Sequence, residues 1–116
     1  MAGISEEVTG QAPERHALFP RIVAVTGSRA IANTDLDKVL LNTTASNYTI
    51  TFALDATITG EIPIGTQVVG LQSGAGTVTF AAGTATFTGA ALATTAVGGR
   101  LVATKIGANA WCVSKQ

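Results

Sequence analysis

The sequence predicts an all-β protein, an antiparallel β-sandwich or barrel of about seven to nine short strands that follows an extended N-terminal arm. Three observations lead to this fold class. Apolar and polar residues alternate with a period of two from Arg21 onward, which is the pattern of half-buried strands. Turns rich in glycine recur about every ten residues, as in antiparallel β-proteins. Only 12% of the 116 residues are charged whereas 47% are hydrophobic, and 13 are glycine, a composition that favours strands and tight turns.

Each expected strand is a short apolar or β-branched run bounded by turn-forming residues. The clearest is 48–54, in which Tyr48, Ile50 and Phe52 alternate with threonine or alanine, so that one face of the strand is apolar. The full set of expected strands is 21–26, 38–42, 48–54, 61–64, 67–72, 77–82, 84–88, 100–106 and 111–114. Pro63 marks 61–64 as an edge strand or a bulge, because proline donates no ladder hydrogen bond. No window after residue 41 predicts a helix.

Two glycine-containing turns are expected to close β-hairpins. One is 73–76, and the other is Ala82-Gly83, where the near copies TVTF and TATF flank the turn. This short period, present only twice, argues against a solenoid. Residues 91–99 are expected to be a loop with strand tendency.

Residues 1–20 are expected to form an anchoring arm distinct from the antiparallel β domain at 21–116. Prolines at 13 and 20 prevent a continuous helix, and the few apolar groups cannot offset the entropy of ordering the segment alone. The arm therefore orders against a partner, and its candidate anchors are Ile4, Val8, Arg15, Leu18, Phe19 and, at the start of the domain, Arg21.

Charge is distributed unevenly along the chain. Nine of the fourteen charged residues lie in 1–40, and the other five are spread over 41–116, while the formal net charge is zero. A neutral chain lacks the field of a general nucleic-acid binder. A charge-poor body is expected to cover its faces with copies of itself or with a partner. The alternative is a monomer with a threonine and asparagine surface.

The sequence shows no pattern typical of a secretory signal or of a membrane span. The opening MAGISEEV is acidic where a secretory signal is basic, and no apolar run approaches the ~18 residues of a membrane span. We therefore expect a chain that is made inside the cell without processing and has no membrane partner.

The residues that could carry chemistry are few. His16 is the one histidine and lies in the arm, and Cys112 is the one cysteine, so no catalytic dyad, zinc site or cofactor is expected. Asp35 and Asp37 are expected to cap backbone amides near a turn. The glycine-rich segment 70–76 lacks the lysine of a phosphate-binding loop.

The aromatic side chains have two candidate roles. Alternation with threonine favours a β-core made by Tyr48, Ile50, Phe52, Phe80, Phe87 and Trp111. The alternative is that Phe52, Phe80, Phe87 and Trp111 stack on sugars or bases.

Three stretches carry a resemblance to a known module. They are DLDKVLLNTTASNYTITF (35–52), IPIGTQVVGLQSGAGTVTFAAG (62–83) and LVATKIGANAWCVSK (101–115). Over roughly residues 22–116 the chain resembles a β-module that recurs in bacteriophage structural proteins, including tail fibres and head fibre or capsid decoration proteins. The positions that match the module are Gly65-Thr66-Gln67, Gln72 to Gly76, Val78 to Gly83, Leu101, Lys105, Gly107, Asn109 and Trp111.

The resemblance implies a homotrimer and a structural role in a virion. A fibre that reaches from virion to host does not fit in 116 residues. We therefore expect a non-enzymatic capsid decoration or head-fibre protein, made in the host cytoplasm and located on the capsid surface, whose arm binds the major capsid protein. The alternative is a tail-fibre or tail-tip module that recognises host surface glycans. A depolymerase is disfavoured, because no suitably spaced pair of carboxylates is evident.

Overall fold

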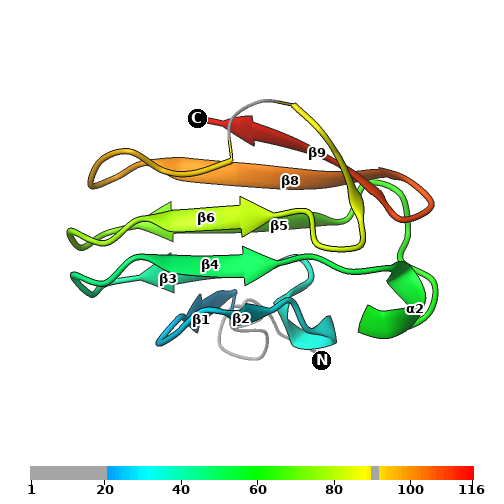
Figure 1. Cartoon of the computed structure of the whole chain (residues 1–116), viewed down its shortest axis with the longest axis horizontal. Coiled ribbons are helices and arrows are strands. Elements are labelled where there is room, and N and C mark those ends of the chain that lie inside the picture. The colour runs from blue at the N-terminus through cyan, green and yellow to red at the C-terminus, as the bar shows by residue number, and fades with distance from the viewer. Residues whose placement is uncertain (1–20, 90–91) are drawn as a thin grey trace, which may run out of the picture.

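The computed structural model describes residues 21–89 and 92–116, and the expected anchors in 1–20 lie outside these ranges. The described residues are mostly β, with nine short strands and two short helical segments (Figure 1). The elements are β1 (Ile22–Ala24), β2 (Arg29–Ala30), η1 (Asn33–Asp35), β3 (Val39–Asn42), β4 (Tyr48–Thr51), α2 (Asp55–Ile58), β5 (Gln67–Gln72), β6 (Val78–Ala81), β7 (Thr86–Thr88), β8 (Arg100–Gly107) and β9 (Ala110–Lys115). The expectation of a β-protein with seven to nine short strands is confirmed.

The strands pair mostly in parallel, so the expected antiparallel architecture is wrong. Six strands form one sheet in the order β1-β3-β5-β8-β9-β7, and three form a second sheet in the order β2-β4-β6. β1, β3 and β5 are parallel neighbours, as are β2, β4 and β6, and β7 is parallel to β9. Among the strands of the described ranges, only the β5–β8 and β8–β9 pairs are antiparallel. Parallel and antiparallel strands share the same two-residue period, so alternation cannot distinguish them.

The first six strands form three stacked coils of a short parallel solenoid. Each coil runs along the larger sheet, turns a corner and continues along the smaller sheet, as the stacked β1 to β6 in Figure 1 show. The second and third coils match with an offset of 30 residues in both sheets, because Val39 lies opposite Val69 and Tyr48 lies opposite Val78. The expectation that the chain forms no solenoid is wrong. The solenoid repeat is the 30-residue offset between the second and third coils, and not the short TVTF–TATF period.

Segment 73–76 is a corner of the third coil and not the expected hairpin. Its glycines allow it to lie directly on the corner of the coil below: a Cβ on Gly74 would be 2.5 Å from the backbone oxygen of Thr43, and one on Gly76 would collide with the backbone oxygen of Ser46. The amide of Gly76 donates to the oxygen of Thr44 at 2.9 Å. The glycines of this motif are therefore explained by close stacking of two corners.

The second expected hairpin, around Gly83, is also not formed. β6 belongs to the smaller sheet, whereas β7 pairs with β9 in the larger one. Gly83 has a φ of 57°, and a Cβ there would collide with the backbone oxygen of Phe52. The chain thus uses this turn to cross between the sheets.

Around Pro63 the expected edge strand is replaced by a turn. The amide of Thr66 donates to the oxygen of Pro63 at 3.2 Å, and Gly65 has a φ of 97°. Ahead of this turn lies α2, a single helical turn that the sequence pattern did not predict. In the segment 91–99, the expected strand tendency appears as an isolated bridge between Thr79 and Ala93.

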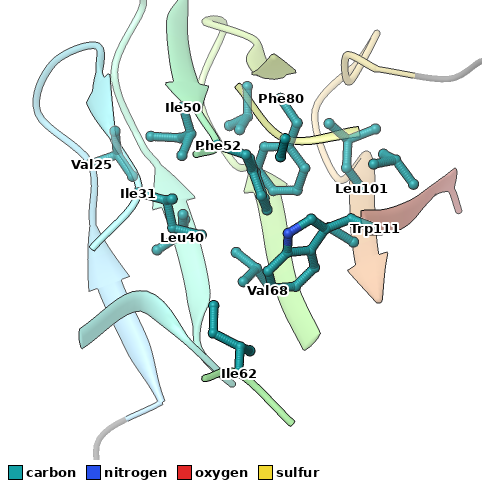
Figure 2. Packing of buried hydrophobic residues seen from close by; sticks show 14 residues of the cluster. Val25, Ile31, Leu40, Ile50, Phe52, Ile62, Val68, Phe80, Leu101 and Trp111 are labelled. Carbon is teal, nitrogen blue, oxygen red and sulfur yellow. The ribbon is translucent and has the colours of Figure 1, made fainter. Parts of the chain in front are cut away.

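The hydrophobic core lies between the two sheets. Phe52 is its centre, with ring centroids 5.1 Å from Phe80 and 5.1 Å from Trp111 (Figure 2). Its ring centroid is also 5.0 Å from that of Phe87. Gly70 makes room for this packing, because a Cβ there would be 3.1 Å from the Phe80 ring. The buried cluster consists of Val25, Ile31, Leu40, Ile50, Phe52, Ile62, Val68, Val78, Phe80, Ala85, Leu101, Ala103, Trp111 and Val113.

Candidate interaction surfaces

A buried ion pair ties the closing strands to the helical turn. Lys105 in β8 is 2% exposed, and its Nζ donates to Asp55 Oδ2 at 2.7 Å and to the Ile62 backbone oxygen at 3.1 Å. Nζ also lies 6.0 Å from the centroid of the Trp111 ring. A lysine with so little exposure is retained only with such partners, because burial of an unpaired ammonium is costly.

Asn109 completes this cluster from the β8–β9 turn. Its backbone has a φ of 56°, a conformation that asparagine tolerates better than most residues. Its Oδ1 accepts from the Asp55 amide at 2.7 Å, and its own amide donates to Asp55 Oδ2 at 3.3 Å. Lys105, Asn109 and Trp111 therefore fix the framework, and their polar groups are turned inward.

A second ion pair fastens the first coil. Both guanidinium nitrogens of Arg29 donate to Asp35, at 2.6 and 2.9 Å, and the Asp35 side chain is 1% exposed. The hydrogen bond to Asp35 raises the pKa of Arg29 above its ordinary value. Asp35 also accepts from the Ala32 amide at 2.8 Å, and Asp37 accepts from the Gln67 amide at 3.1 Å, so both aspartates cap backbone amides as the sequence predicts.

Buried amides occupy the same place in successive corners. Asn42 and Gln72 are paired in the register of β3 and β5 and are 0% and 2% exposed. Asn42 Nδ2 donates to the Ser46 oxygen at 2.8 Å, and Gln72 Nε2 donates to the Gly74 oxygen at 3.1 Å. Thr94 Oγ1 donates to Gln72 Oε1 at 2.7 Å. These side chains satisfy the backbone where the chain leaves each sheet.

The two sheets differ in what they present on their outer faces. On β3 and β5, the residues that alternate with the buried Leu40 and Val68 are Val39, Leu41, Val69 and Leu71, together with the exposed Gln67 at the start of β5. Val102 on β8 is 7% exposed, yet it lies outside the core cluster that contains its neighbours Leu101 and Ala103. The part of the larger sheet made by β1, β3, β5 and the middle of β8 is therefore largely apolar on both sides. We define its outer aliphatic residues as the apolar face: Ile22, Ala24, Val39, Leu41, Val69, Leu71 and Val102.

The smaller sheet has a hydroxyl-rich outer face. Ile50 and Phe80 point into the core, and the residues that alternate with them include Thr49, Thr51 and Thr79. Thr49 and Thr79 are register partners on β4 and β6. We call Thr49, Thr51 and Thr79 the threonine face.

A shallow groove of about 160 Å³ lies at the edge of the apolar face. It contains both signs of charge, and it brings Arg21, the one described member of the expected anchoring set, close to Asp37 and Lys38. The full lining is Arg21, Asp37, Lys38, Val39, Gln67 and Val69.

The residues expected to form the β-core lie as follows. Ile50, Phe52, Phe80 and Trp111 are at most 1% exposed, and the partly buried Tyr48 and Phe87 pack against the cluster. Aromatic rings enclosed to this degree cannot stack on a sugar without unfolding the core. Phe52, Phe80 and Trp111 therefore cannot form a surface on which glycans stack.

Within the described ranges, no group of three or more His, Cys, Asp or Glu side chains is arranged to hold a metal ion. Cys112 is half-buried in β9. In the same part of the chain, no helix is long and apolar enough to cross a membrane.

Comparison with protein-family models, with curated proteins and with solved structures finds no match for this chain. The assignment of a role therefore depends on the residues and on the geometry described above.

Sequence analysis missed the apolar face and the Lys105–Asp55 pair. The first had a visible signal, because VVGL in β5 and RLVA in β8 are nearly continuous apolar runs, which is typical of strands covered on both sides. The Lys105–Asp55 pair had no signal in the sequence, since 50 residues separate its two members.

Proposed function

We propose that this protein is a non-enzymatic structural component of a bacteriophage virion, of the capsid decoration or head-fibre type. Residues 1–20 would bind the major capsid protein, and the β domain would form a trimer that projects from the capsid surface. The protein needs no cofactor in this role, and its partners are other protein chains.

The observation that carries the proposal is the strand order of the larger sheet. β1 follows residue 21 directly and forms one edge of that sheet, whereas β9 and β7 lie at the opposite edge. The described chain thus begins at one end of the stack, and the closing strands lie at the other (Figure 1). This separation suits an anchored end and a projecting end.

The chemistry of the polar groups supports a structural role as well. Lys105, Asp55, Arg29 and Asp35, the charged residues with the most structured surroundings, hold the framework together through ion pairs. Their engagement in the fold favours a protein that works through its surfaces. The motif that resembles the phage module is part of the same framework.

Gold-labelled antibodies against the chain, applied to virions of the phage that encodes it, test this role. Label over the head is expected. Label confined to the tail would favour the receptor-binding alternative, and the absence of label from virions would overturn both.

The separate roles of residues 1–20 in capsid binding and of the β domain in projection are tested with the variant that lacks residues 1–20. We expect a folded body, with an unchanged β circular-dichroism spectrum, that no longer co-sediments with capsids lacking the protein. The full-length chain is the control. Capsid binding by the truncated body at full occupancy would show that the arm is not the anchor.

A further inference from the structure

The apolar face has the organisation of a surface that is covered in the working protein. Its residues form two rows across neighbouring strands. Ile22, Val39, Val69 and Val102 are successive register partners, and so are Ala24, Leu41 and Leu71. Ile22 is 59% exposed and Ala24 is exposed, Val39, Leu41, Val69 and Leu71 are half-buried, and Val102 is 7% exposed.

The smaller sheet packs against the opposite side of the larger sheet, across the core, and so does not cover these rows. Strands with aliphatic residues on both sides occur in sheets that are covered on both sides. The threonine face, by contrast, has the hydroxyl groups of a surface that can remain in water. We therefore expect a partner to cover the apolar face and water to cover the threonine face.

The charges around the apolar face point to a second copy of this chain as the occupant. The two rows contain no charged residue, so an oppositely charged partner would gain nothing from them. At the rim, Asp37 lies beside Arg21 and Lys38, and Arg100 lies at the end of the second row. A rim with both signs is self-complementary, because the acid of one copy can meet a base of another.

The area of the apolar face can be compared with the area that a stable contact between two copies buries. Four strands about 4.8 Å apart, with two rows of side chains, cover about 200–300 Å². One copy contributes about 800 Å² to a stable pair, so a single face-to-face contact is too small. Packing of three copies does not enlarge the face, so the charged rim and the flanks of the sheet must add to each contact, and the number three is taken from the proposed function.

We propose that the apolar face is the surface through which three copies of this chain pack around a common axis, with the threonine faces turned outward. This inference rests on the trimer of the proposed function and assigns its interface. It leaves the arm free to bind the capsid.

Sedimentation of the full-length chain between about 1 and 100 µM tests the assignment. The wild-type chain is expected to sediment at three times the monomer mass of 11.7 kDa. Val69→Lys places a charge in the centre of the interface and is expected to weaken association about a hundred-fold or more. Thr49→Lys is the matched control, because Thr49 is also half-buried in a strand but lies on the threonine face, and it is expected to sediment like the wild type.

A second variant protects the test against loss of folding in Val69→Lys. Ile22 is 59% exposed and lies outside the core cluster, so Ile22→Lys removes nothing from the protomer core. It is expected to retain the wild-type circular-dichroism spectrum and to weaken association about ten-fold. Association of Ile22→Lys at wild-type strength, or dissociation caused by Thr49→Lys alone, would overturn the assignment.

The outcomes separate this inference from the proposed function. A chain that labels virion heads but sediments as a monomer overturns the interface and leaves the capsid role. A chain that forms trimers sensitive to Ile22→Lys but is absent from virions supports the interface and overturns the role.

Discussion

Replacement of Lys105 by methionine tests whether the buried ion pair holds the fold together. Methionine keeps the length and the apolar stem of lysine but removes the ammonium that donates to Asp55 at 2.7 Å and to the Ile62 oxygen at 3.1 Å. Asp55 would then keep the amide of Asn109, at 3.3 Å, as a donor to its carboxylate. The variant therefore leaves a largely buried negative charge without its countercharge.

The expected loss follows from the burial of the two partners. Removal of one member of a buried pair typically costs 3–5 kcal/mol. The Asp55 side chain is 14% exposed and can recover some hydration, so we expect the lower end, about 3 kcal/mol. For a domain of this size, that loss lowers the melting temperature by about 12–20 °C.

A double-mutant cycle measured by urea unfolding separates the pair from other effects. Asp55→Asn and Lys105→Met should each destabilise strongly, and together they should cost about 2 kcal/mol less than their sum. Lys115→Met, at an exposed site in β9, is the matched control and should change little. All variants are compared at one protein concentration, because self-association adds to apparent stability. Additive losses, or a Lys105→Met variant as stable as the control, would refute the reasoning.

Three further predictions concern the corner, the core and the first coil. Gly76→Ala should destabilise by at least about 2 kcal/mol because its methyl group collides with the Ser46 oxygen, whereas Gly27→Ala, with open space around it, should not; equal urea midpoints would contradict the stacked corners. Trp111→Ala should cost about 3–5 kcal/mol in thermal unfolding, since the ring is fully buried, and an unchanged melting temperature would place it at the surface. Arg29→Lys should cost about 1–2 kcal/mol, because lysine cannot make both hydrogen bonds to Asp35. The raised pKa of Arg29 means that this contribution is present at every pH below the ordinary arginine value and is lost only as pH rises through the raised one, so the loss should be the same at about pH 6 and about pH 9.

The sequence by itself determined the local conformation of most of the described chain. Alternation of apolar residues located eight of the nine strands to within three residues at each end, but it missed β2 and added a strand at 61–64; it also selected Phe52 and Trp111 as inward-facing. These features are local, because the direction of a side chain on a strand depends only on whether its position is odd or even.

Only the tertiary structure decided which strands are neighbours. A glycine-rich turn such as 73–76 fits a hairpin and a solenoid corner equally well, and the choice depends on whether the two strands bond to each other or to strands in other coils. The 30-residue offset between the second and third coils was readable, but it relates only these two coils, and five of its eight paired residues differ.

The same limit applies to the two candidate interaction features. The Lys105–Asp55 pair and the rows of the apolar face join residues that are far apart in the chain and adjacent only because parallel coils stack in register. The composition of β1, β3 and β5 shows that both sides of these strands are largely apolar. Which side meets the core and which remains for a partner is set by the position of the second sheet, because a strand buries one side only where another layer lies against it.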